Sequence, residues 1–116
     1  MADSVLFHNP ACSKSRAALA LIAASGVEPM LRDYLEWPPS TDEIQRLVAM
    51  LGVPERELLR GDDPEFTALG LDDPGVSPQR LIEAIATHPR LLQRPIFVHG
   101  GRAVIARPPE RVLELL

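Results

Sequence analysis

The sequence predicts a single α/β domain, and three observations lead to that prediction. The chain has 116 residues, and a chain of this size buries roughly two-thirds of its unfolded surface without needing a disulfide or a metal. Strand-like apolar segments occur near its two ends, whereas residues 38–88 approximately show only helix signals. The first segments read strand, helix, strand, which implies a parallel pair with a right-handed crossover. We therefore expect βαβ, an all-helical insertion between the second and third strands, and then ββα.

The first three elements are predicted from apolar runs and turn residues. Residues 5–7 form a short apolar run typical of a buried strand, and residues 30–34 are a second strand candidate. Between them, Ser13 can cap a helix over about 14–25, and Gly26 is suited to end it. These segments form the predicted βαβ unit.

The middle of the chain contains several helix-start signals. Ser40 and Glu43 have the spacing of a capping box, and the apolar residues that follow share one helix face until Gly52. Further helical segments are expected after Pro54, over residues 64–70, and from Ser77-Pro78 to His88-Pro89.

The end of the chain returns to strands. Residues 96–98 and 103–105 flank the turn at 99–101 and predict a hairpin. Pro108-Pro109 can begin a last helix, whose inward-facing residues are expected to be Val112, Leu113 and Leu116.

This order of elements matches a thioredoxin-like mixed sheet in which residues 38–88 form the insertion and the whole chain 1–116 is one domain. A thioredoxin-like fold places a cis-proline beside its active-site thiol. Pro95 opens the first hairpin strand. We therefore expect the Arg94–Pro95 bond to be cis, although only about one Xaa-Pro bond in twenty is.

Composition narrows the classes of partner. The net charge is −4 and the sequence pI is about 5.3, which is the wrong sign for a nucleic-acid-binding surface. No apolar run approaches the roughly 20 residues of a membrane span. A single cysteine cannot form an intramolecular disulfide and fits a reducing compartment. We expect a cytoplasmic protein that binds neither nucleic acid nor membrane.

The lone Cys12 is the main candidate for chemistry, because it stands at a strand-to-helix turn. A helix N-terminus and nearby cations lower the pKa of a thiol, and His8, Lys14 and Arg16 are close in sequence. Ser15 completes a CxxS pattern, so its hydroxyl could hydrogen-bond the thiolate. An isolated cysteine is more often a core residue, but the turn-forming Pro10 favours an exposed site.

Two other chemistries are disfavoured. His8 and Cys12 have the spacing of half a metal site, but a closed zinc site needs about four protein ligands, so we expect no metal. A tyrosine-phosphatase-like loop would need an arginine six places after Cys12, where Ala18 stands.

Residues 8–16, HNPACSKSR, resemble the signature HNPxCxxSR of the glutaredoxin-coupled arsenate reductases. The resemblance extends over almost the whole chain. Further matching segments are Tyr34-Leu35-Glu36, Leu58-Leu59-Arg60, Leu69-Gly70-Leu71, the HPxLxxRPI segment from His88 to Ile96, and Ala106-Arg107-Pro108.

The resemblance implies a thioredoxin-like fold and a set of site residues. Cys12 would be the nucleophile, His8 would activate or orient it, and Ser15 would hydrogen-bond to it. The residues that would converge on arsenate are Arg60, Arg94 and Arg107.

The resemblance also implies a reaction sequence. The thiolate would attack arsenate, water would leave, and a thioarsenate ester would form on Cys12. Glutathione would then add to the arsenic as a co-substrate, with no bound cofactor. Glutaredoxin would supply reducing equivalents, and arsenite would be released.

Two other functions remain open. The first is a glutathione-dependent monothiol oxidoreductase of unknown substrate, which CxxS permits but which does not require three arginines. The second is a non-enzymatic regulator, because relatives of this fold bind RNA polymerase. Those regulators commonly carry CxxC, whereas this chain has Ser15 at the position of the second cysteine. Each arginine could also be an ordinary surface residue, and Arg60 could pair with an adjacent aspartate.

Overall fold

The computed structural model describes residues 3–116 and divides them into two compact units. The first unit contains residues 3–37 and Arg94–Leu116, and the second contains Pro38–Gln93. Each unit is described by itself.

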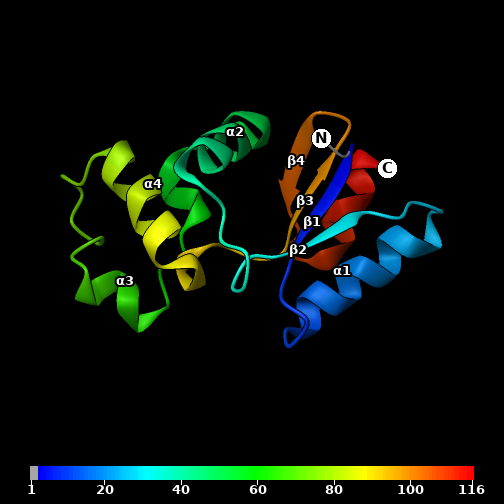
Figure 1. The fold of residues 1–116 in the computed structure, drawn as a ribbon, viewed down its shortest axis with the longest axis horizontal. Helices are drawn as coiled ribbons and strands as arrows, with labels where there is room; N and C mark the ends of the chain where they lie inside the picture. The colour runs from blue at the N-terminus through cyan, green and yellow to red at the C-terminus, as the bar shows by residue number, and fades with distance from the viewer. Residues whose placement is uncertain (1–2) are drawn as a thin grey trace. The chain divides into compact units, whose positions relative to one another are not determined.

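The first unit is built on a mixed sheet of four strands within the described residues (Figure 1). The strand order is β2-β1-β3-β4, with β1 parallel to β2 and antiparallel to β3, and β3 antiparallel to β4. This arrangement confirms the predicted βαβ start and terminal hairpin. The strands are β1 Ser4–His8, β2 Met30–Asp33, β3 Ile96–His99 and β4 Arg102–Ile105.

The strand register brings distant segments to one edge of the sheet. Phe7 of β1 pairs with Ile96 of β3, and Ile96 pairs with Ile105 of β4. His8 pairs with Asp33 at the end of β2. The segments that follow β1, β2 and β4, together with the residues that precede β3, therefore emerge at the same edge.

Helix α1, Ser13–Ala24, and the 3₁₀ helix η3, Pro109–Leu115, pack together on one face of this sheet (Figure 1). Their apolar side chains meet those of the strands in a dry core, which is the main stabilising contribution of this unit. The buried members of this core are Leu6, Ala18, Ile22, Phe97, Val104, Ala106 and Val112.

The last helix corrects one prediction. Val112 is buried as expected, but Leu113 and Leu116 are exposed, and Leu115 packs against the core instead. The segment is 3₁₀ rather than α-helical, and three residues per turn bring positions 112 and 115 to one face. The predicted inward face assumed the α-helical spacing.

The predicted hairpin turn is confirmed and is shorter than expected. His99 and Arg102 pair with each other, so the turn consists of Gly100 and Gly101 alone. Their φ values are +59° and +78°, as a type I′ turn requires, and glycine adopts them without steric cost. The Arg94–Pro95 bond is cis as predicted, and the Arg107–Pro108 bond is also cis.

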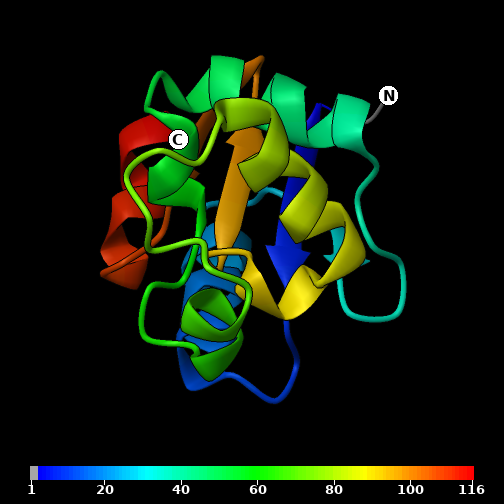
Figure 2. The ribbon, with the colours of Figure 1, turned by 90° about the vertical axis from the view of Figure 1, so that its left-hand side faces the viewer.

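The second unit consists of short helices (Figure 2), and α2 packs against α4. The capping box of α2 is confirmed: the Ser40 hydroxyl accepts from the Glu43 N–H at 3.2 Å, and the Glu43 carboxylate accepts from the Ser40 N–H at 3.1 Å. A single bridge pairs Leu59 with Leu92. The helices are α2 Thr41–Leu51, η1 Glu55–Leu58, α3 Pro64–Ala68, α4 Pro78–Thr87 and η2 Pro89–Leu91.

No helix within residues 3–116 combines the length and the apolar character needed to cross a bilayer.

Candidate functional site

The loop from β1 to α1 is organised by Asn9. Its side-chain oxygen accepts from the Ala11 N–H at 3.0 Å, and its carbonyl accepts from the Cys12 N–H at 2.9 Å. Its own N–H donates to the Ser15 hydroxyl at 3.3 Å. These bonds fix the turn on which Cys12 stands, because a short Asx turn leaves the chain few alternatives.

Cys12 itself occupies the N-cap of α1, where Ser13 was expected, and the helix begins one residue earlier than predicted. Its backbone is extended and the residue is partly exposed. The thiol makes no capping hydrogen bond of normal geometry. The sulfur nevertheless lies over the unpaired N–H groups of the first helical turn.

The pKa of the Cys12 thiol is lowered from 9.0 to about 7. Partial burial acts in the opposite direction and raises the pKa. The lowering comes from the Ser15 N–H, from hydrogen bonding and charge of the Arg94 guanidinium, and from the Lys14 N–H. About half of the thiol is therefore ionised at neutral pH, which is the reactive form.

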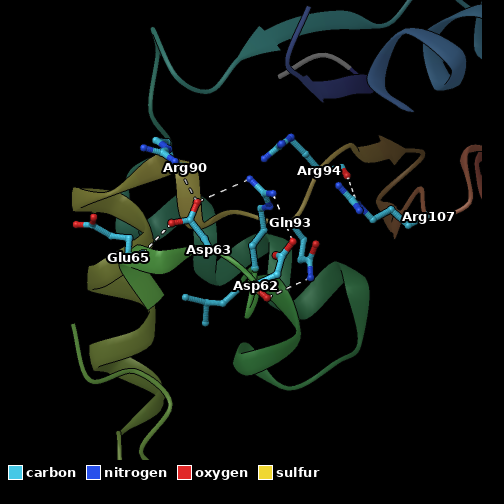
Figure 3. Close-up of polar contacts among 9 residues, drawn as sticks. Asp62, Asp63, Glu65, Arg90, Gln93, Arg94 and Arg107 are labelled. Atoms are coloured by element: carbon cyan, nitrogen blue, oxygen red, sulfur yellow. Dashed lines mark hydrogen bonds and ion pairs between the residues drawn. The ribbon is translucent and has the colours of Figure 1, made fainter. Parts of the chain in front are cut away.

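Arg94 precedes β3 and lies at the sheet edge from which the Cys12 loop emerges. Its pKa is raised: burial opposes the charge, but Cys12 and Tyr34 favour it. Its carbonyl accepts from Arg107 Nε at 2.6 Å, and Figure 3 shows the Arg107 side chain turned toward that carbonyl. The structure therefore links Cys12, Arg94 and Arg107 within one unit.

His8 is the last residue of β1 and is buried. Burial lowers its pKa, Asp33 opposes this effect, and Arg16 adds to it. The lowered pKa favours the neutral form of the ring, which supplies little positive charge to the thiolate. Its Nδ1 has no hydrogen-bond partner within the described chain. Any action of His8 on Cys12 is consequently that of a neutral imidazole.

Ser15 contributes to this site through both its backbone and its side chain. Its N–H lowers the pKa of Cys12, whereas its buried hydroxyl accepts from the Asn9 N–H at 3.3 Å. The serine of the CxxS pattern thus acts on the sulfur through its backbone N–H and on the loop through its side chain.

Arg60 lies in the second unit, where it forms ion pairs with Asp62 at 3.7 Å and Asp63 at 3.9 Å. Arg90 joins Asp63 at 3.4 Å (Figure 3), and Asp63 also caps α3 by accepting from the Glu65 N–H at 2.9 Å. The expected pairing of Arg60 with an adjacent carboxylate is present. Its convergence with Arg94 and Arg107 stays a prediction.

Two residues of this region were not singled out as site residues from the sequence. Tyr34 follows β2 and touches the Arg94 guanidinium, and Asn9 holds the Cys12 loop. Asn9 could have been recognised, because Asn before Pro is a turn signal. The position of Tyr34 depends on strand pairing, for which one buried aromatic residue gives no sequence signal.

No group of three or more His, Cys, Asp or Glu side chains suited to a metal ion occurs among residues 3–116. At the Cys12 edge, the thiolate form of the cysteine is a nucleophile, and a guanidinium group such as that of Arg94 can bind an oxyanion in two-point geometry.

Comparisons with known proteins identify the family of this chain. The sequence pattern of the ArsC family matches residues 7–115. The "Arsenate reductase" of Haemophilus influenzae is 41% identical over 113 residues, covering 97% of both chains. The "Uncharacterized protein YfgD" of Escherichia coli is 43% identical over 112 residues, covering 96% of this chain and 94% of that protein. The solved structure "Arsenate reductase from Vibrio cholerae" is 45% identical, covers 97% of both chains and has a TM-score of 0.95. The resemblance stated from the motifs is confirmed, and the chain belongs to the ArsC family and has its thioredoxin-like fold.

Proposed function

We propose that the protein reduces arsenate to arsenite through the thiol of Cys12. The proposal rests on one observation: the Arg94 guanidinium helps to lower the pKa of the Cys12 thiol to about 7. The same positive group that favours the thiolate could also bind an oxyanion beside it. The names of full-length relatives at about 40% identity support arsenate as that oxyanion.

In the first proposed step, the Cys12 thiolate attacks the arsenic of arsenate, and one oxygen leaves as water after protonation. The product is a thioarsenate ester in which arsenic is still pentavalent. Arg94 and Arg107 neutralise the negative charge of the oxygens during this step. His8, as a neutral ring, orients the loop or accepts a proton, and the Ser15 N–H stabilises the sulfur anion until it bonds to arsenic.

The reduction needs two electrons, which a chain with one cysteine cannot supply as an internal disulfide. We propose that glutathione adds to the arsenic and displaces a second water. A glutaredoxin thiolate then attacks the glutathione sulfur, and the arsenic–sulfur electron pair stays on arsenic, which becomes trivalent. The mixed disulfide leaves with glutaredoxin, and hydrolysis releases arsenite and Cys12. No resident cofactor takes part, and this thiol chemistry fits a reducing compartment such as the cytoplasm.

Arg60 is included in the proposal as a third anion ligand, on the family resemblance of Leu58-Leu59-Arg60. Its ion pairs with Asp62 and Asp63 compete with an anion for the same guanidinium. We therefore expect Arg60 to contribute less to anion binding than Arg94.

The proposal is tested by following arsenate-dependent NADPH oxidation with glutathione, glutaredoxin and glutathione reductase. The parent should turn over, and Cys12→Ser should show no arsenate-dependent rate while retaining the parent's circular dichroism spectrum. A parent that is folded and inactive with arsenate, but reduces a glutathione mixed disulfide in the same coupled system, would replace this proposal with the monothiol oxidoreductase alternative.

A further inference from the structure

Tyr34 stands at the sheet edge that carries the Cys12 loop. It directly follows β2, whose last residue, Asp33, pairs with His8 at the end of β1. Its side chain is completely buried. Parallel strands end at the same edge, so the residue after β2 and the loop after β1 are neighbours.

The backbone around Tyr34 is fixed by a turn. The Asp33 carboxylate accepts from the Leu35 N–H at 3.2 Å, and the Asp33 carbonyl accepts from the Trp37 N–H at 2.8 Å. An Asx turn of this kind leaves little freedom to the residue inside it. The tyrosine is therefore a rigid group, and burial of its ring keeps the hydroxyl in one place.

The Tyr34 hydroxyl is buried and lies near enough to the Arg94 guanidinium to favour its positive charge. A guanidinium has donors only, so the phenolic oxygen accepts. The Nε of Arg94 is buried and has no hydrogen-bond partner within residues 3–116. The groups that can orient the guanidinium are therefore the Tyr34 hydroxyl and the Cys12 sulfur, which both favour its charge.

We propose that Tyr34 is a positioning residue, whose hydroxyl anchors the Arg94 guanidinium against the Cys12 sulfur. It touches neither the sulfur nor the anion in this role; it acts through Arg94. A flexible arginine loses side-chain entropy when it is held beside a thiolate, and a fixed acceptor reduces that loss. The inference concerns the site of the proposed function and extends it by one residue, but it can be tested without arsenate.

The test is the pH dependence of Cys12 alkylation by iodoacetamide in Tyr34→Phe, which keeps the ring and removes the hydroxyl. We expect a higher thiol pKa than in the parent and, at pH 6, alkylation slower by about threefold. Trp37→Phe is the matched control, because it alters an exposed aromatic residue three positions away and should leave the profile unchanged. An unchanged or lowered pKa in Tyr34→Phe would overturn the inference.

A double-mutant cycle separates positioning from a general structural effect. In an Arg94→Ala background, Tyr34→Phe should change the alkylation rate no further, because the residue through which it acts is absent. An equal slowing in both backgrounds would mean that Tyr34 acts by some other route, and would refute the anchor. If Tyr34→Phe does not fold, 3-fluorotyrosine at this single tyrosine weakens the acceptor without changing the shape, and the same rise in thiol pKa is expected.

These outcomes also distinguish the inference from the proposed function. A parent without arsenate turnover whose thiol still responds to Tyr34→Phe retains the positioning role and loses the assigned substrate. An active parent whose thiol is indifferent to Tyr34→Phe retains the substrate and loses the anchor.

Discussion

The two units both contain clustered arginines, but they balance the charge of these residues in different ways. In the second unit, Arg60 and Arg90 share the buried carboxylate of Asp63. In the first, Arg94 faces a thiol and a phenol, and Arg107 binds a backbone carbonyl. Carboxylates cancel the positive charge, whereas a phenol and a backbone carbonyl orient a guanidinium and leave its charge available to the Cys12 thiolate or to an anion. Whether a carboxylate neutralises an arginine, more than the presence of the arginine itself, therefore distinguishes a structural arginine cluster from one suited to bind an anion.

The largest effect is expected from removing Asp63, the carboxylate that Arg60 and Arg90 share in the second unit. Asp63→Ala loses the α3 cap and the partner of two arginines, and should lower the free energy of unfolding by about 2 kcal/mol. Asp63→Asn, which can still cap, should lie between that variant and the parent. Denaturant titration followed by far-ultraviolet circular dichroism measures both.

Asp62→Ala is the matched control for this comparison. It removes a carboxylate from the same arginine, but its side chain is 80% exposed against 4% for Asp63. Its loss should cost about 0.5 kcal/mol or less. Equal costs for the two aspartates would show that Asp63 does not organise the cluster.

The effect of Arg94 on the reactivity of Cys12 is tested by Arg94→Ala. Loss of its charge and hydrogen bond should raise the pKa of Cys12 from about 7 toward the ordinary 9.0, and alkylation at pH 6 should slow by roughly tenfold, or about 1.4 kcal/mol. Stopped-flow measurement of thiolate reactivity gives this rate.

Arg102→Ala provides the control, because it removes an exposed arginine of the same unit at the hairpin end of β4. The two variants have the same net charge. Slowing of similar size in both would mean that the general field of the protein, and not the local contact, sets the reactivity of Cys12.

The smallest effect is a pH dependence of stability. Folding lowers the pKa of Cys12, so the unfolded chain binds more protons between about pH 7 and 9. The free energy of unfolding of the parent should therefore rise with pH over this interval relative to Cys12→Ser, and the difference between the two should become independent of pH below about pH 7. Paired urea titrations at pH 6, 7, 8 and 9 measure it. A difference that stays constant with pH would contradict a thiolate stabilised by the fold.

Signals confined to a few neighbouring residues predicted the fold well. The Ser40–Glu43 capping box and the Gly100-Gly101 turn appear where their local chemistry requires them. The last helix was misjudged at Leu113 because the sequence does not distinguish 3₁₀ from α spacing over a short segment.

The sequence predicted only those site residues that lie together in one motif. Cys12 and Ser15 were recognisable from one turn, but the N-cap lies at Cys12 and not at the expected Ser13, because this position depends on where the helix begins. Tyr34 needed the register of β2 against β1 before it could be related to Arg94. The effect of burial on His8 likewise depends on tertiary packing, which spacing along the chain does not encode.

The positions of the tryptophan and the tyrosine have a practical consequence for fluorescence experiments. The chain has one tryptophan and one tyrosine, and both lie within four residues at the end of β2. Trp37 stacks on Arg32 with the guanidinium carbon 3.7 Å from the ring centre, and Tyr34 contacts the arginine that faces the thiol. Intrinsic fluorescence is thus a built-in reporter of the nucleophile's surroundings. Residues 38–93 contain neither of these two chromophores, so following that unit directly calls for backbone probes.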